Sequence, residues 1–115
     1  MIAHVVLFRP KPSLSDEERR GLIASLQKAV DGIPSIARAS IGRRMLLHRP
    51  GYEALMAEDY EFAAVLEFNT EADLRAYLDH PAHAELGARL FTSAAAVLAY
   101  DFDCVAPDRL SALVK

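Results

Sequence analysis

Residues 65–83 have the sequence VLEFNTEADLRAYLDHPAH. Its pattern is typical first of a strand, then of a helix, and then of a second helix. The strand begins before this stretch, because alternate positions from 60 to 68 place one apolar set on a single face. Thr70 can cap the helix that follows, and Glu71 and Asp73 bring to its first turn the negative charge that the helix dipole favours. We therefore predict a strand over 60–68 followed directly by a helix that begins after Thr70.

A proline divides the helical part of this stretch in two. Because Pro81 disfavours a helical conformation in the residue before it, His80 is expected to leave the helix, and Pro81 can serve as the first residue of a new helix over about 81–96. We expect the His80 side chain to bond backbone groups of the turn itself. A final strand is predicted from LAYDFDCV, residues 98–105.

The N-terminal part of the chain supplies a strand and a helix. Residues 2–9 are rich in β-branched and aromatic types, and prolines follow them. Ser15 and Glu18 have the spacing of a capping box, and the helix that they begin is expected over 16–31. Its predicted apolar face consists of Leu22, Ile23, Leu26, Val30 and Ile33.

The segment between this helix and the strand over 60–68 is less regular. Residues 36–47 alternate at first and then lose their period near Gly42, which we interpret as a strand with a β-bulge. Residues 48–59 have turn residues and no sustained period, so we predict a mobile loop in a position to cover a pocket or an interface. The basic cluster of this region is Arg38, Arg43, Arg44 and Arg49. We interpret it as a solvated strand face, with an anion site as the alternative.

The predicted elements follow the order β-α-β-β-α-α-β, which is the split βαβ arrangement of ferredoxin-like α+β domains. We assign residues 1–106 to this domain and residues 107–115 to a C-terminal tail. The first strand is apolar on both faces, because His4, Val6 and Phe8 alternate with Ala3, Val5 and Leu7.

Two apolar sheet faces need two covers, and the helices of so short a chain can cover only one. The economical cover for the other face is a second copy of the same sheet, which gives a homodimer in the form of an α/β barrel. The alternative is that residues 48–59 and the C-terminal tail cover this face.

Composition and charge restrict the class of protein. The chain has 115 residues, of which 52% are hydrophobic and 25% charged, and its net charge of −3 argues against a nucleic-acid partner. We expect no membrane span, because no segment approaches the roughly 20 apolar residues that a span requires, and no signal sequence, because the apolar run of MIAHVVLFRP is too short for a signal h-region followed by a cleavage site. The single cysteine, Cys104, fits a cytoplasmic protein, and its alternation with Tyr100 and Phe102 predicts that it is buried in the core.

Four segments of the sequence resemble the stress-responsive dimeric α/β-barrel (Dabb) family. They are HVVLF at 4–8, GIP at 32–34, the stretch 65–83 quoted above, and YDFDCV at 100–105. The stretch 65–83 is the most specific of them, because a strand, a helix and an H-P-A-H turn in this order rarely match by chance. The resemblance covers residues 2–105 and implies a ferredoxin-like fold that dimerises through its sheets.

The family includes plant polyketide cyclases of the olivetolic acid type, which close rings by an intramolecular aldol reaction in a pocket between sheet and helices. The resemblance implies that Tyr77 and His83 of the YLDHPAH motif are the catalytic groups. Positions of the pocket wall that are aromatic in the cyclases are aliphatic here, which implies a different substrate. The ligand-binding residues that we assign are His4, Val6, Leu22, Ile23, Leu26 and Asp101.

These residue types suit proton transfer next to a carbonyl group. An imidazole with a pKa near 6.5 can take and return a proton, so His83 is assigned as the acid–base group. Tyr77 is assigned to donate a hydrogen bond to the enolate oxygen that forms. Asp101 is a candidate partner that could orient or charge His4, since the first and last strands of a ferredoxin-like sheet are neighbours; the alternative is a buried ion pair that serves stability or the barrel lining. In the alternatives, Tyr77 and His83 hold a ligand without catalysis or serve the structure alone.

The leading functional hypothesis is therefore a protein that binds a small apolar carbonyl compound, with cyclase-like proton transfer. The alternative is a non-catalytic, stress-responsive homodimeric assembly protein whose interior is filled. An open apolar pocket around Tyr77, His83 and His4 favours the first, and a filled interior favours the second. We assign no metal to His4, His80 and His83, because the sequence shows no second shell for them, and we predict no haem or other cofactor.

Overall fold

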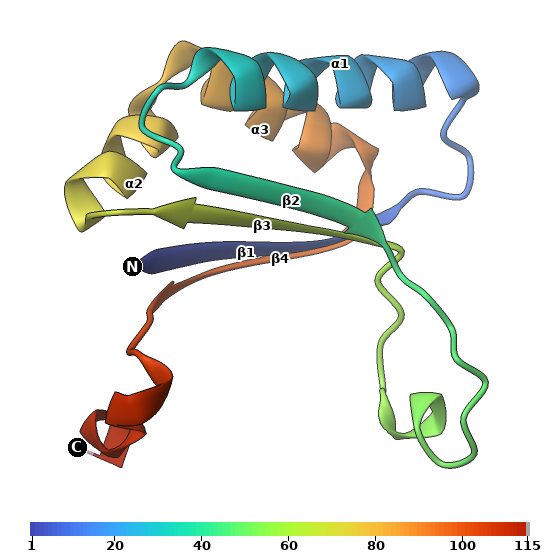
Figure 1. The fold of residues 1–115 in the computed structure, drawn as a ribbon. Coiled ribbons are helices and arrows are strands. Elements are labelled where there is room, and N and C mark those ends of the chain that lie inside the picture. Colours follow the sequence, from blue (N-terminus) through green and yellow to red (C-terminus); the bar gives the residue numbers. More distant parts are fainter. Residues whose placement is uncertain (115) are drawn as a thin grey trace.

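A computed structural model describes residues 1–114, and in them four antiparallel strands form one sheet with three helices on one of its faces (Figure 1). The strands are β1 (Ile2–Pro10), β2 (Arg38–Arg43), β3 (Phe62–Phe68) and β4 (Ala94–Asp103), in the spatial order β2-β3-β1-β4. The helices are α1 (Asp16–Gly32), α2 (Glu71–Asp79) and α3 (Pro81–Ser93), and two short 3-10 segments are η1 (Glu53–Leu55) and η2 (Pro107–Val114). This is the predicted ferredoxin-like α+β fold. Residue 115, the last of the predicted C-terminal tail, lies outside the described residues.

Side chains cap the first two helices as predicted. The Ser15 hydroxyl accepts the Glu18 backbone N–H at 3.1 Å, and the Glu18 carboxylate accepts the Ser15 N–H at 3.3 Å, which completes a capping box. The Thr70 hydroxyl accepts the Asp73 N–H at 3.1 Å and caps α2.

The proline turn joins α2 to α3 as the sequence predicts. His80 has an extended backbone (φ −71°, ψ 139°), and Pro81 is the first residue of α3. The His80 Nδ1 accepts the Ala82 N–H at 3.0 Å, so this imidazole caps α3, and the prediction that it bonds the turn is confirmed.

The predicted bulge in the second strand is wrong. Gly42 pairs with Ala63, and the register between β2 and β3 continues without a slip from Arg38 to Arg43. β2 is an edge strand and most of its side chains are exposed, so burial does not impose an alternating pattern on it. Its neighbour β3 begins at Phe62, two residues later than predicted.

The boundary between α3 and β4 also differs from the prediction. α3 ends at Ser93 rather than near residue 96, and β4 begins at Ala94 rather than at Leu98. Ala94 and Ala96 are paired with Pro10 and Arg9 of β1. Hydrogen bonding to β1 therefore overrides the helix preference of these alanines.

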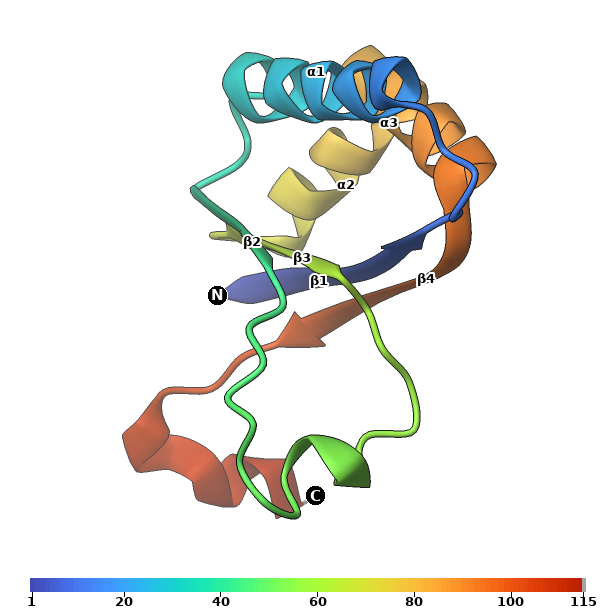
Figure 2. The same cartoon turned by 90° about the vertical axis from the view of Figure 1, so that its right-hand side faces the viewer.

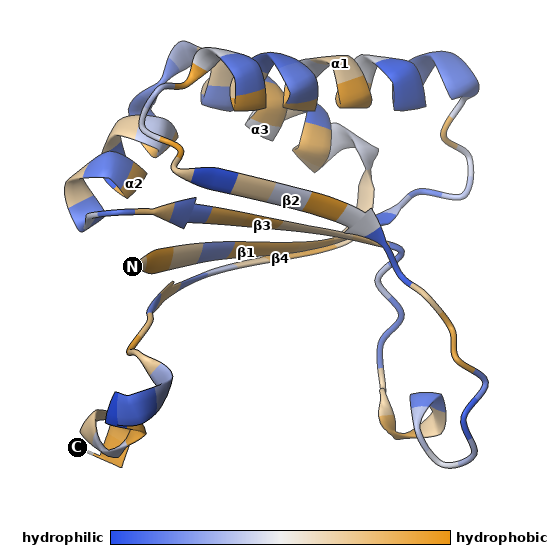
Figure 3. Ribbon diagram, viewed as in Figure 1, coloured by the Kyte–Doolittle hydropathy of each residue, from blue (hydrophilic) through white to orange (hydrophobic). Residues whose placement is uncertain are grey.

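The face of the sheet opposite the helices is uncovered in the single chain (Figures 1 and 2). It carries apolar residues, including Val65, Tyr100 and Phe102, which are 36%, 58% and 50% exposed. Cys104 follows β4 on this open side and is exposed, so the prediction that it is buried is wrong for the single chain. The connection that contains η1 and the segment that contains η2 both project on this side and carry hydrophobic stretches (Figures 1 and 3).

The packed core lies between the sheet and the helices, at the end where α1 finishes and β3 leads into α2. Phe68, Ala29 and Ile33 are between 0% and 3% exposed there. Towards its other end, α1 packs beside α3 and stands away from the sheet (Figure 1). Within residues 1–114, none of the helices has the length and hydropathy that crossing a membrane requires.

Candidate functional site

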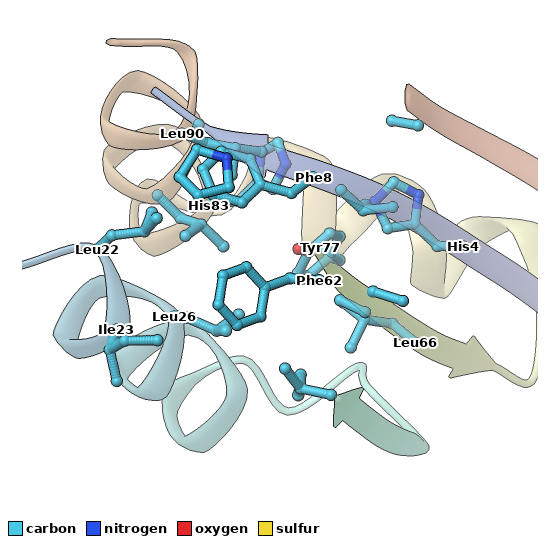
Figure 4. A pocket seen from close by; sticks show the side chains of 18 of the residues that line it. His4, Phe8, Leu22, Ile23, Leu26, Phe62, Leu66, Tyr77, His83 and Leu90 are labelled. Carbon is cyan, nitrogen blue, oxygen red and sulfur yellow. The ribbon is translucent and has the colours of Figure 1, made fainter. Parts of the chain in front are cut away.

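A cavity of about 510 Å³ lies between the sheet and the helices (Figure 4). Its walls are mainly aliphatic and aromatic, and they include Val6, Phe8 and Leu66 from the sheet and Leu22, Leu26, Leu86 and Leu90 from the helices. The side chains of α1 do not fill the space because the helix stands away from the sheet. The volume is within the range of small-molecule pockets, and an apolar wall with few polar groups is typical of such pockets.

Tyr77 of α2 is the most buried polar side chain of the cavity wall, at 3% exposure. Its ring packs against those of Phe68, His4 and His83, with centroid separations of 5.3, 5.6 and 4.7 Å. Burial alone shifts the pKa of this group and no hydrogen bond among residues 1–114 contributes, and the hydroxyl is directed into the cavity (Figure 4). Burial raises the pKa of Tyr77 to about 12, so the hydroxyl keeps its proton and can donate it in a hydrogen bond.

His83 lies in the first turn of α3 and is half-buried. Its Nδ1 is 3.1 Å from the Leu78 carbonyl oxygen. A carbonyl oxygen only accepts, so Nδ1 carries the hydrogen and Nε2 is left as the acceptor of the neutral ring. Burial has the largest effect on the pKa of His83 and lowers it. The hydrogen bond to Leu78 raises the pKa and the charge of His4 lowers it, so that the resulting pKa is below 6.5. His83 is therefore a neutral base at neutral pH.

His4 and Asp101 are paired across β1 and β4, in direct register. The His4 Nδ1 is 2.5 Å from the Asp101 Oδ1, which confirms the expected proximity of the two side chains. His4 is 5% exposed, whereas the Asp101 side chain is 44% exposed. The carboxylate accepts the Nδ1 hydrogen and fixes the orientation of the imidazole, whose edge-on contact with Tyr77 places it in the same cavity wall.

The sequence model of the Stress responsive A/B Barrel Domain (Dabb) family matches residues 2–104. The chain belongs to the Dabb family. Among curated proteins, none matches this Dabb chain by sequence.

Solved structures of the same fold include proteins of unknown function and an enzyme. A dimeric ferredoxin-like protein of unknown function from Thermobifida fusca is 28% identical, with a TM-score of 0.70 over 90% of each chain. A Dabb family protein from Mesorhizobium loti is 23% identical, with a TM-score of 0.69 over 91% of this chain and 97% of the other. A hydroxynitrile lyase from Passiflora edulis is 18% identical, with a TM-score of 0.74 over 92% of this chain and 96% of the other.

The Dabb fold brings together every residue to which the sequence analysis assigned catalysis or ligand binding. These residues all line the cavity, and they are His4, Val6, Leu22, Ile23, Leu26, Tyr77, His83 and Asp101. His80 is not in the cavity wall, in agreement with its capping role.

The cavity of this Dabb chain also has wall residues that the sequence analysis did not assign. Leu86, Gly87 and Leu90 lie three, four and seven residues after His83, so helical periodicity from that histidine was a usable signal for them. Arg19 and Arg43 were not assigned because charged residues on a predicted surface face carry no such signal. In the described part of the Dabb chain, residues 1–114, no group of three or more histidine, cysteine or acidic side chains is arranged to hold a metal ion.

Proposed function

We propose that this Dabb protein binds a small apolar carbonyl compound in the cavity and catalyses cyclase-like proton transfer next to the carbonyl group. The observation that carries this proposal is the pairing of a hydroxyl donor, Tyr77, with a neutral imidazole acceptor, His83, in one apolar cavity. An open cavity also favours ligand binding over the alternative of an assembly protein with a filled interior.

The reaction begins with proton abstraction at the carbon next to the carbonyl group. The His83 Nε2 takes this proton, so the C–H bond breaks, an N–H bond forms, and the electron pair moves onto the carbonyl oxygen as an enolate. The Tyr77 hydroxyl donates a hydrogen bond to that oxygen, and the apolar surroundings strengthen the contact. In a substrate with a second carbonyl group, the enolate carbon attacks that group, a C–C bond closes the ring, and protonated His83 returns the proton to the new alkoxide.

His4 and Asp101 act in this proposal as positioning residues. Asp101 orients His4, and the His4 ring packs edge-on against Tyr77, which restricts where the Tyr77 hydroxyl points. That the fold can support catalysis is consistent with the hydroxynitrile lyase from Passiflora edulis.

The test is deuterium exchange into a straight-chain decanone in D₂O, followed by proton NMR. The wild type is expected to accelerate exchange next to the ketone, and His83→Gln is expected to reduce the rate by a factor of about 10² or more. Tyr77→Phe is expected to reduce it as well. His80→Asn is the matched control, because asparagine preserves the cap of α3 and residue 80 is outside the cavity wall. Equal exchange rates for wild type and His83→Gln would overturn the catalytic assignment.

We also propose that the protein is a homodimer that joins the uncovered faces of two sheets. The apolar character of this face supports the proposal, as do the dimeric ferredoxin-like proteins of the same fold. Val65→Glu places a charge in the middle of the face and is expected to give a monomer by sedimentation equilibrium. Ala72→Glu, on an exposed position of α2, is the control and is expected to remain dimeric. A wild type that sediments as a monomer contradicts this proposal.

We also propose a cytoplasmic location, which the single cysteine, Cys104, supports.

A further inference from the structure

The cavity wall has an exposed side between α1 and β2, which we take as the opening of the cavity. Ile23 of α1 and Ile41 of β2 line the cavity and are 57% and 46% exposed, whereas Tyr77 and His4 in the same wall are almost completely buried. Figure 1 shows α1 above β2, which is an edge strand of the sheet. A ligand that enters past the two isoleucines meets His4 and Tyr77 at depth.

The charged side chains of the cavity wall are separated by sign. Arg19 of α1 and Arg43 of β2 stand on the two sides of the opening, on the same faces as Ile23 and Ile41. Asp101, the carboxylate of the wall, lies beside His4 on β4. An anionic group on a ligand is thus attracted to the two arginines at the opening, whereas the carboxylate at the far end already holds His4.

Both arginines are available to a ligand. Arg19 forms no ion pair with a carboxylate in residues 1–114, although it is partly buried. Arg43 has a loose ion pair with Glu61 at 3.9 Å, and both side chains are largely exposed, so this pair contributes little. The Arg43 guanidinium lies 5.3 Å from the centroid of the Phe62 ring, which is itself part of the cavity wall. This stacking keeps the positive charge at the opening.

The sheet register gives the distance between the two ends. Arg43 is opposite Phe62, and His4 is opposite Leu66, so the two ends are four residues apart along β3. At about 3.3 Å per residue, this separation is about 13 Å. Aliphatic side chains of α1 and α3 line the space between, which offers no partner for a polar group in the middle of a ligand.

We infer that the substrate is an amphipathic carbonyl compound with an anionic headgroup, a carboxylate or a phosphate, held between Arg19 and Arg43. Its apolar chain crosses the aliphatic part of the cavity, and its carbonyl group reaches Tyr77 and His83. This inference rests on the proposed function, and adds to it the chemical class of the substrate and its orientation. Arg43 thus belongs to an anion site, the alternative to a solvated strand face.

The test measures binding by isothermal titration calorimetry with three compounds of equal length. They are a straight-chain oxodecanoic acid whose ketone lies next to the terminal methyl group, its methyl ester, and the phosphate monoester of the matching oxo alcohol. The double variant carries both Arg19→Gln and Arg43→Gln. The control is Arg20→Gln, which changes the adjacent arginine outside the cavity wall. We expect wild type and Arg20→Gln to bind one of the anions about tenfold more tightly than the ester.

In the double variant this preference is expected to disappear while the affinity for the ester stays the same, and the tighter of the two anions identifies the headgroup. Equal affinity of wild type for acid, phosphate and ester overturns the inference, and so does an anion preference that survives in the double variant. If none of the three compounds binds but wild type still exchanges deuterium into the decanone, the inference fails and the proposed function stands. If exchange is absent as well, both fail.

Discussion

Gly87 provides a direct test of whether the cavity is open space. It lies in the middle of α3 and in the cavity wall, and a Cβ atom at this position would meet no other atom within 4 Å. A glycine in a helix interior costs about 0.8–1 kcal/mol relative to alanine. Gly87→Ala should therefore raise the free energy of unfolding by about 1 kcal/mol and the melting temperature by about 4 °C.

Gly87→Leu separates stability from binding. Leucine has nearly the helix propensity of alanine, and its side chain adds apolar area that the cavity can bury in part, so the expected gain in the free energy of unfolding is about 1–2 kcal/mol. The same side chain lies between His83 and Leu90 and occupies the space of a ligand. Ketone binding should then be lost. Ala88→Leu adds the same side chain at an exposed position of α3 outside the cavity wall, and should leave binding unchanged.

The assays for these variants are urea denaturation and calorimetric titration with the decanone. A loss of stability greater than about 1 kcal/mol in Gly87→Leu would show that the space beside α3 is already filled, because overpacking is destabilising. Unchanged ketone binding in Gly87→Leu would place the ligand elsewhere. Either result refutes the cavity as the binding site.

Three further predictions concern stability. Tyr77→Phe should change the free energy of unfolding by less than about 0.5 kcal/mol in urea denaturation, because no hydrogen bond within residues 1–114 contributes to the pKa of the hydroxyl; a loss above about 1 kcal/mol would reveal a hydrogen bond. Leu22→Asp with Leu26→Asp should abolish cooperative melting, since two carboxylates then face the apolar interior, and retained cooperativity would contradict the placement of α1. The folded-state pKa of His83 is below 6.5, so the unfolded chain takes up the proton first as pH falls, and wild type should lose stability relative to His83→Gln below about pH 6.5; a pH-independent difference in urea midpoints would argue against the burial of His83.

Local rules predicted the parts of the fold that local chemistry determines. The capping box at Ser15, the cap at Thr70 and the break at Pro81 all depend on a side chain and the backbone a few residues away. The start of β4 at Ala94 was not predictable in this way, because it depends on pairing with β1, more than eighty residues earlier in the chain. Cys104 was assigned to the core because alternation identifies an apolar face but not whether the chain itself covers it.

In the candidate site, too, some features can be predicted from the sequence and others depend on how distant elements pack. The family resemblance indicates Tyr77, His83 and His4, and the strand order of the predicted fold makes Asp101 a candidate partner of His4 without saying whether both side chains share a face. The cavity itself was not predictable, because the apolar face of α1 has the same sequence whether the helix fits closely on the sheet or stands away from it. Arg19 belongs to the cavity wall only because α1 leaves the opening beside β2.

The central claim is that Tyr77 and His83 face a ligand in an acid–base cavity, and histidine NMR titration tests it most directly. The ring resonances of wild type and Tyr77→Phe are followed against pH, with and without the decanone and a polyketide-like lactone. We predict that His83 titrates with a pKa below 6.5, that the ligand shifts its resonance, and that loss of the Tyr77 hydroxyl reduces this ligand-induced shift. A His83 that titrates like a free imidazole and responds to neither compound would contradict the account and leave the motif as a helix junction.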